Sequence, residues 1–439
     1  MNSKNTNPTS NLESVIPSSP KLRNGNLFSN SELYRYYAGY SDFFVKEQLI
    51  WIEQKLGKKG IIVIDPWNGS GTTTFVSSIL GYSCYGFDIN PVMVLVSKAK
   101  LYCANFLEIN KLINFIDHNK PLYKDSLIKS NDPLCSWFTS KTVGYIRYIE
   151  KMIRKICNID TTIPLKSIFS YDEVSPQLAF YYVVLFELLR KYTSIFSGTN
   201  PTWIKAKIDE ELKLNISFPT LYSDYISLIK ESAKLLISKV DIDLCKIDIG
   251  NSKHINLSDN SVDCIITSPP YCTRIDYAVY TRIELALLGF SVKEFDFLRR
   301  KMIGTPTISH SHINYDIYKG KPYENILTKI EKHDSKAAKG YYLKTYYQYF
   351  YQMEESIREL SRITRIGGIA TFVIQDSWFK DIYIDLPTLI CSIMEQYGFK
   401  ICHIDKIKVT NNMRYMNTKS NLYRKSNKSY ESVIILERV

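Results

Sequence analysis

The feature that most constrains this chain is an alternation of short β-branched runs with helical segments near its start. Residues 60–64, GIIVI, are followed by the polar loop DPWNGSGTTT and then by the helical pattern FVSSILG. A second run, SCYGFDINP, precedes a second helical stretch, VMVLVSKAKLYCANFL. Strand, loop, helix, strand and helix in this order are typical of a parallel sheet with crossover helices. The sequence therefore predicts an α/β fold.

The strand pattern breaks off after residue 105 and returns near residue 241. Residues 106–240 hold long amphipathic stretches such as VGYIRYIEKMIRKI and LAFYYVVLFELLRKY, which predict helices. Strand-like runs then resume as CKIDI, DCIITSPPY, GGIATFVI, KICHIDKIKV and ESVIILERV. We therefore predict one catalytic domain formed by residues 31–105 and 241–439, split by a mainly helical insertion over 106–240. Residues 291–345 show little periodicity and are expected to be a further, irregular insertion.

Composition excludes some classes of protein. The 439 residues are 45% hydrophobic, and no apolar run approaches the roughly 18–20 residues of a membrane span. Residues 1–30 are rich in Ser, Asn and Pro without a signal-peptide core, so we expect a flexible leader and no membrane partner. The nine cysteines form no C-x-x-C pair, which is typical of reduced thiols in a cytoplasmic protein. His310 and His312 form an isolated pair, so no metal site is expected.

The loop Asp65-Pro66-Trp67-Asn68-Gly69-Ser70-Gly71-Thr72 joins the first strand to a helix. Glycines let such a loop turn tightly and approach a ligand, and a helix N-terminus favours a negative group. No Gly-Lys-Ser/Thr follows, so the loop is not a nucleotide-phosphate loop. Asp88 ends the next strand, 23 residues after Asp65, where a carboxylate can accept hydrogen bonds from ribose hydroxyls. Loop and acid together indicate a nucleoside-bearing cofactor, although a plain strand–helix turn remains the alternative.

Another strand ends abruptly in Ser268-Pro269-Pro270-Tyr271. Proline has no backbone donor, so the two prolines must stop a central strand and make a rigid turn. The sequence around this turn, GNSKHINLSDNSVDCIITSPPY, together with DPWNGSGTT and GFDINP, resembles the motifs of S-adenosylmethionine-dependent DNA methyltransferases that modify exocyclic amines. The resemblance covers roughly residues 30–105 and 247–439. A looser match, LYRYYAGYSDFF, places Tyr36 and Tyr37 either at the cofactor or in the core.

The resemblance implies a Rossmann-like methyltransferase sheet that binds S-adenosylmethionine and flips a target base out of duplex DNA. It implies cofactor contacts for six positions: Asp65, Gly69, Gly71, Thr72, Asp88 and Asn251. Asn251 lies where the family often has an acid beside the adenine, and an amide oxygen can also accept from that amine. None of the family's usual motif orders fits this chain, so the motif order does not place the DNA-recognition region. We name residues 106–240 and 291–345 as the candidate regions for reading the DNA sequence.

The catalytic turn would consist of Ser268, Pro269, Pro270 and Tyr271. The Ser268 oxygen and the Pro269 carbonyl can accept from the target amine, and Tyr271 offers a face on which the flipped base stacks. Serine at the first position resembles the members that methylate cytosine N4, with adenine N6 as the alternative. The resemblance also implies a restriction-modification or defence context, with a partnered restriction enzyme.

Three other classes stay open. A cytosine-C5 enzyme needs a thiolate, usually after a proline, whereas Cys272 follows a tyrosine and is expected to be structural. An RNA or protein methyltransferase can use the same turn for another planar amine. An inactive DNA-binding relative is the third alternative, and the intact turn together with Asp88 argues against it.

The charge balance is compatible with a nucleic-acid partner. Lys and Arg number 56 against 44 Asp and Glu, which gives +12, although an AT-rich genome would also enrich lysine. Seven basic residues and no acid lie between residues 406 and 428. We predict that this hairpin and residues 291–345 contact DNA phosphates, with a solvated loop as the alternative. The basic residues are Lys406, Lys408, Arg414, Lys419, Arg424, Lys425 and Lys428.

Overall fold

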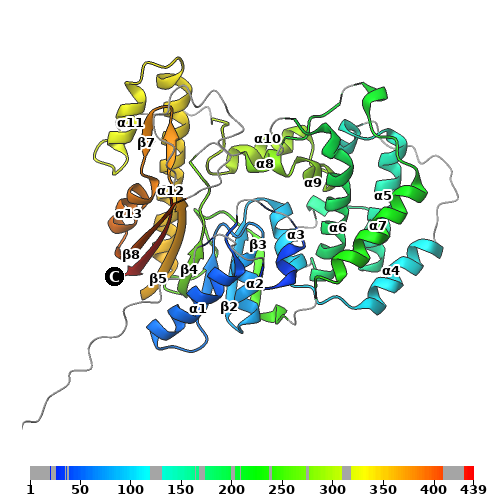
Figure 1. The fold of residues 1–439 in the computed structure, drawn as a ribbon, viewed down its shortest axis with the longest axis horizontal. Helices are drawn as coiled ribbons and strands as arrows, with labels where there is room; N and C mark the ends of the chain where they lie inside the picture. The colour runs from blue at the N-terminus through cyan, green and yellow to red at the C-terminus, as the bar shows by residue number, and fades with distance from the viewer. Residues whose placement is uncertain are drawn as a thin grey trace, which may run out of the picture.

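A seven-stranded sheet forms the centre of the molecule (Figure 1). The structure is a computed structural model, and it describes residues 20, 26–34, 36, 39–118, 131–163, 165–167, 174–198, 203–207, 209–236, 240–272, 276–308, 318–408 and 430–439. The sheet has the strand order β3-β2-β1-β4-β5-β9-β8. The strands are β1 (Ile62–Asp65), β2 (Ser83–Asp88), β3 (Cys245–Ile249), β4 (Val262–Thr267), β5 (Thr364–Gln375), β8 (Phe399–Lys408) and β9 (Tyr430–Arg438).

Strand direction places the functional edge of this sheet. The first five strands in chain order pair in parallel, while β9 is antiparallel to both β5 and β8. Since β8 therefore runs parallel to β5, it ends at the same edge as β1, β2 and β4. The strand order reverses between β1 and β4, and open α/β sheets bind ligands outside the carboxyl ends at such a switch point. The predicted fold class, a Rossmann-like methyltransferase sheet with a mainly helical insertion, is confirmed.

Helices cover both faces of the sheet because side chains alternate along each strand. Val63 belongs to the hydrophobic cluster on one face, which includes α1, α3 and the helical insertion, and Ile64 belongs to the cluster on the other, formed with α12 and α13. None of the described helices is both long and apolar enough to cross a membrane. The helices are α1 (Asp42–Leu56), α2 (Thr72–Ile79), α3 (Pro91–Lys100), α4 (Phe106–His118), α5 (Ser140–Ile156), α6 (Pro176–Thr193), α7 (Phe218–Ala233), α8 (Tyr277–Tyr280), α9 (Arg282–Leu287), α10 (Val292–Lys301), α11 (Glu324–Glu331), α12 (Leu343–Ile363) and α13 (Leu386–Gln396).

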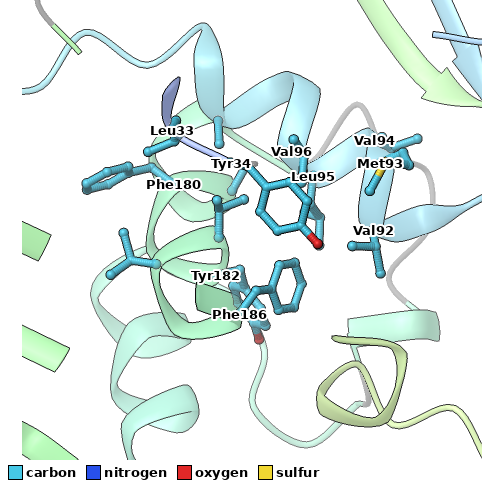
Figure 2. Close-up of a cluster of buried hydrophobic side chains, with 14 of the residues drawn as sticks. Leu33, Tyr34, Val92, Met93, Val94, Leu95, Val96, Phe180, Tyr182 and Phe186 are labelled. Carbon is cyan, nitrogen blue, oxygen red and sulfur yellow. The ribbon is translucent and has the colours of Figure 1, made fainter. Parts of the chain in front are cut away.

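The helices α4 to α7 come from residues 106–240 and lie beyond α3 at the right of Figure 1. Helix α6 is buried almost all round, which is typical of a helix at the centre of a bundle, and it packs against α3, α5, α7 and α9. Figure 2 shows this contact, with Phe180, Tyr182 and Phe186 of α6 beside Val92–Val96 of α3. The insertion therefore shares its core with the sheet domain. The domain boundaries themselves remain a prediction.

The expectation of irregular structure over residues 291–345 is wrong for the described part of that region. It contains α10, α11 and the start of α12. Helix α10 begins with a capping box, in which Ser291 and Glu294 exchange side-chain and backbone hydrogen bonds. The helix is short and mostly polar, and only Phe295 and Leu298 of it are buried. Sequence analysis also missed a short hairpin, β6 (Ser377–Phe379) with β7 (Ile382–Ile384).

Candidate active site

A pocket opens at the carboxyl ends of β1, β2, β3 and β4. It encloses about 740 Å³, including solvent at its mouth. Seven of the ten predicted cofactor-binding and catalytic residues line it together, although they come from four separate loops. They are Gly69, Asp88, Asn251, Ser268, Pro269, Pro270 and Tyr271. The topology therefore brings the predicted cofactor side and the predicted catalytic turn into one cavity.

Asp88 is the carboxylate of this pocket, at the last position of β2. Its two oxygens accept backbone hydrogen bonds from Gly69 at 2.9 Å and from Asn90 at 2.8 Å. Burial raises the pKa of Asp88 to about 6, and the charge of Asp65 adds to the rise, whereas the two backbone donors lower it. Asp88 thus fixes the glycine loop and still lines the pocket as an acceptor for a ribose hydroxyl.

Asn251 begins the loop after β3 and lies against the same pocket. Its side-chain oxygen accepts from the Lys253 N–H at 3.1 Å, which leaves one lone pair for another donor. Gly250 precedes it without a side chain, and a Cβ there would lie 2.6 Å from the Phe87 ring. The close approach of this loop to β2 therefore depends on glycine, and it sets Asn251 beside Asp88.

Ser268 occupies the first position of the turn after β4. Its Oγ donates to the Val373 carbonyl of β5 at 2.9 Å. A hydroxyl has a single hydrogen, so the oxygen faces any further partner as an acceptor. In the part of the chain that the structure describes, no donor reaches the Pro269 carbonyl, which makes it the second acceptor of the turn.

The other half of the turn is held from two sides. The Tyr349 hydroxyl of α12 donates to the Pro270 carbonyl at 3.0 Å, and the Tyr277 hydroxyl accepts from the Tyr271 N–H at 3.2 Å. Gly304, just after α10, has φ +78°, and a Cβ there would lie 2.8 Å from the Tyr271 carbonyl oxygen. Tyr271 is half-buried and lines the pocket. The turn is thereby fixed before any base arrives.

Three predicted cofactor residues do not line this pocket. The Asp65 carboxylate is buried and accepts from Tyr40 at 2.9 Å, from Thr267 at 2.6 Å and from the Trp67 N–H at 3.1 Å. Burial raises the pKa of Asp65, while these hydrogen bonds lower it. Gly71 has φ +77° and packs against Ser97, where a Cβ would come within 2.6 Å. Thr72 lines a separate cavity near Tyr36 and Lys100. These three shape the loop that the cofactor would contact, and their direct contacts remain predictions.

Several lining residues were missed from the sequence. Trp67 lies inside the glycine loop and Tyr277 lies six residues after Tyr271, so proximity to the motifs was their only signal. Lys301, Met302 and Ile303 also line the pocket, which they reach through the path of α10, and the only local signal of that helix is the capping box at its start. Tyr36, proposed from the loose N-terminal match, does line the pocket. Tyr37 lies outside the described residues.

The predicted basic hairpin is only partly described. Lys406 and Lys408 are exposed at the end of β8, at the same sheet edge as the pocket, and Lys406 pairs with Asp385 at 3.5 Å. Arg414, Lys419, Arg424, Lys425 and Lys428 lie outside the described residues, as do His310 and His312. Burial raises the pKa of the Cys272 thiol, which fits the structural role expected for it.

The site is of the methyltransferase class. It is defined by the order of the strands in the sheet, by the glycine loop after β1 and by the carboxylate at the end of β2. Comparison with known proteins agrees. The chain is 24% identical to the type II methyltransferase M.BsoBI of Geobacillus stearothermophilus over 85% of this chain and 79% of that protein. It is 21% identical to the type II methyltransferase M.MvaI of Kocuria varians, over 76% and 74%, and 24% identical to M.AvaI of Nostoc sp., over 84% and 78%.

No family model matches the chain. Among solved structures, the cyclase SpnF aligns with 92% of this chain and 84% of its own, at 7% identity and a TM-score of 0.31, too low for an argument about fold. The resemblance to DNA methyltransferases inferred from the motifs is confirmed by the named relatives, which support site-specific DNA methylation. S-adenosylmethionine is the methyl donor that they imply. The acceptors Asp88 and Asn251 fit its ribose and adenine, since both groups carry donors.

Proposed function

We propose that this protein transfers a methyl group from S-adenosylmethionine to the exocyclic N4 amine of cytosine in duplex DNA. The observation that carries the proposal is the shared pocket, because the proposed cofactor contacts Asp88 and Asn251 and the proposed catalytic residues Ser268 and Tyr271 all line it. Asp88 stands at the carboxyl end of β2, Asn251 follows β3, and the turn with Ser268 and Tyr271 follows β4. Such an arrangement is expected for a ligand site at a topological switch point.

The residues of the turn act on the target amine. An exocyclic amine is a poor nucleophile because its lone pair is delocalised into the ring. Acceptors around its two hydrogens favour the tetrahedral nitrogen that attacks. Ser268 Oγ has its own hydrogen committed to Val373, so it presents an acceptor, and the Pro269 carbonyl presents another. When bound, S-adenosylmethionine supplies an electrophilic methyl group on its sulfonium sulfur.

Tyr271 would receive the flipped base. It lines the pocket while its backbone is fixed through Tyr277, so the stacking surface is preorganised. Burial raises the pKa of Tyr271, which keeps the phenol neutral at physiological pH. The phenol is therefore not expected to act as a base, and the proposed role of Tyr271 is to stack on the flipped base. Placing the target in such a pocket requires extrusion from the duplex, at a cost of a few kcal/mol.

Cytosine N4 is proposed over adenine N6 because serine stands at the first position of the turn, in likeness to the cytosine-N4 members. Adenine N6 is the main alternative. Covalent attack at cytosine C5 is disfavoured by Cys272, whose buried thiol has a raised pKa and would not ionise readily. RNA as substrate and an inactive DNA-binding relative remain lesser alternatives. A partnered restriction enzyme fits the names of the relatives and is part of the proposal.

The test is to methylate duplex DNA with the purified protein and S-adenosylmethionine, digest it to nucleosides and identify these by mass spectrometry. N4-methylcytosine is expected. N6-methyladenine alone would overturn the assignment of the base, and methylation of RNA alone would overturn the substrate.

The mechanism is tested on the same assay with substituted turns. Ser268→Ala should lower kcat about 100-fold, by analogy with the loss of one preorganised hydrogen-bonding group, and Ser268→Ala/Tyr271→Ala should abolish turnover. Ser392→Ala is the matched control, because among the described residues its Oγ bonds only the Thr388 carbonyl on α13. A fully active double variant would refute the mechanism.

A further inference from the structure

A second cavity lies between the helical insertion and α9–α10. It encloses about 1060 Å³, open to solvent, and carries Lys207 and Lys213 on the insertion side and Arg282 on the other. Figure 1 shows α8, α9 and α10 in the upper middle of the view, between α12 and the helices of the insertion. The cavity therefore lies where the two candidate regions for DNA recognition approach each other, and no residue of it belongs to the pocket described above.

Arg282 is the unusual residue of this cavity. Its guanidinium lies over the rings of Trp137 and Phe295, with centroids 5.7 and 5.5 Å away, and no acceptor among the described residues bonds to it. Burial lowers the pKa of Arg282, and the neighbouring Arg299 lowers it further, against a smaller opposite effect of Asp296. A flat cation close to two aromatic rings and without an acceptor retains all its donors for an anion.

The acids around this cavity are already engaged. Asp132 holds Arg147 through two hydrogen bonds, at 2.8 and 3.1 Å. Asp276 accepts from Arg299 at 2.6 Å, and Asp296 pairs with the same arginine at 3.2 Å. Asp132 is therefore balanced by Arg147, whereas Asp276 and Asp296 share the single charge of Arg299, and none of the three carboxylates bonds to Arg282.

Lys207 is a second cation of this kind. Its Nζ lies 4.7 Å from the centroid of the Phe196 ring, and it forms no ion pair with a described residue. Lys213 already pairs with Glu210. The cavity therefore offers a net positive charge from Arg282 and Lys207, each beside an aromatic ring.

Helix α10 connects this cavity to the catalytic pocket. Val292 and Phe295 line the cavity, and Lys301 lines the pocket. The nine steps from residue 292 to residue 301 rise about 14 Å, which is close to four base-pair steps of DNA at about 3.4 Å each. Lys293, Phe297 and Arg300 are exposed along the same helix. Neither Lys293 nor Arg300 forms an ion pair within the described part of the chain.

We propose that Arg282 and Lys207 bind the phosphate backbone of the duplex a few base pairs from the flipped base, with the exposed face of α10 along the intervening backbone. This rests on the proposed function, since it takes the target to be duplex DNA. A phosphate fits Arg282 because a planar guanidinium can bond two phosphate oxygens at once, and the rings of Trp137 and Phe295 pack against it. The site carries no sequence information by itself and sets the position of the duplex on the enzyme.

The experiment measures binding of a short fluorescein-labelled duplex by anisotropy over a series of salt concentrations. Arg282→Ala should weaken binding about tenfold and reduce the salt slope by about 0.9, the effect of one lost phosphate contact. Arg282→Lys should restore the slope but only part of the affinity, because it keeps the charge and loses the fork. Lys207→Ala should resemble Arg282→Ala.

Lys59→Ala is the matched control: Lys59 is exposed and without an ion partner among described residues, and it precedes β1 at the opposite edge of the sheet. It should leave affinity and slope unchanged. Equal behaviour of Arg282→Lys, Arg282→Ala and Lys59→Ala would overturn the proposal, and so would tighter binding of single-stranded RNA than of the duplex. Calorimetric binding of S-adenosylmethionine and nucleoside analysis on the same samples report on the proposed function separately, because anisotropy requires no turnover.

Discussion

Asp88 is both half-buried under the glycine loop and proposed as a charged acceptor for the cofactor, and burial opposes the charge. Its carboxylate must be charged to accept from ribose hydroxyls, yet its place under the glycine loop is poorly solvated, and burial raises its pKa to about 6. The backbone donors of Gly69 and Asn90 compensate for part of that cost. Such a carboxylate titrates close to physiological pH, so cofactor affinity becomes sensitive to acid.

The first prediction concerns this titration. Above about pH 6 the acceptor is charged, and below it the proton competes with the ribose hydroxyls, so affinity for S-adenosylmethionine should fall by up to tenfold per unit as the pH drops below about 6. Calorimetry at a series of pH values measures this affinity.

Asp88→Asn should bind S-adenosylmethionine more weakly at neutral pH and lose this pH dependence, because the amide does not titrate. A wild-type affinity that stays flat from neutral to pH 5 would contradict the assignment, and a dependence that survives in Asp88→Asn would point to Asp65, whose pKa is also raised.

Among single residues, the sequence predicted those whose role can be recognised from the neighbouring residues in the chain. Gly69, Asp88 and Ser268 stand at strand ends, where a local pattern of glycine, acid or proline is visible, and they do meet in one pocket. Arg282 carries no such pattern, since its character comes from Trp137 and Phe295, which are distant in the sequence or on another helix. Partners formed by tertiary structure could not be predicted from spacing.

At the scale of elements, the strands were predictable because β-branched runs alternate with turn residues, and β3, β4, β5, β8 and β9 lie where such runs occur. Helices α10 and α11 were not, because each buries a narrow stripe and is mostly polar: α10 buries two residues and α11 buries Ile326, Leu327 and Ile330. The β6–β7 hairpin has strands of three residues, too short for a periodic signal. Both helices are amphipathic, but they are short and largely polar, and this hid the elements nearest the proposed DNA surface.

Helix α10 also reaches the catalytic turn. Gly304 follows it at φ +78°, and a Cβ there would press on the Tyr271 carbonyl oxygen at 2.8 Å. Gly304→Ala should displace the turn and lower kcat about tenfold or more, with little change in cofactor affinity, because Asp88 and Asn251 belong to other loops. Turnover on duplex DNA and calorimetry on the same variant separate the two effects.

Gly289, just before α10, supplies the control for that prediction. It has φ +85°, and a Cβ at this position would meet no other atom within 4 Å, so Gly289→Ala adds backbone strain without a clash. It should cost stability, about 1 kcal/mol, but leave kcat close to wild type. Equal loss of kcat in both variants would mean that strain near α10, and not contact with Tyr271, controls turnover.

At the scale of the whole molecule, the insertion is anchored to the sheet domain by polar as well as apolar contacts. Beside the α3–α6 contact of Figure 2, Glu284 of α9 is fully buried, pairs with Arg190 of α6 and accepts from the Tyr34 hydroxyl at 3.0 Å. Arg190 also donates to the Tyr280 carbonyl at 2.6 Å. Three segments that are far apart in the sequence thus contact the buried charge of Glu284. No local sequence pattern predicts this contact.

This arrangement predicts strong coupling between the insertion and the sheet domain. Arg190→Ala would leave Glu284 buried without its counter-ion and should lower the free energy of unfolding by about 3–5 kcal/mol. Lys55→Ala, which removes a partly exposed pair with Glu437 at 3.7 Å, should cost about 1 kcal/mol or less. Chemical denaturation, followed by tryptophan fluorescence and circular dichroism, measures both.

The double variant decides whether the buried charge is the cause. Arg190→Ala/Glu284→Gln removes the charge but keeps an oxygen that can accept from Tyr34, so it should be more stable than Arg190→Ala alone. If the insertion and the sheet domain share one core, every variant should also unfold in a single transition seen equally by both probes. If the double variant loses as much stability as Arg190→Ala and Glu284→Gln together lose when each is measured alone, packing of the arginine over Tyr280, at 4.2 Å, matters more than the charge of Glu284.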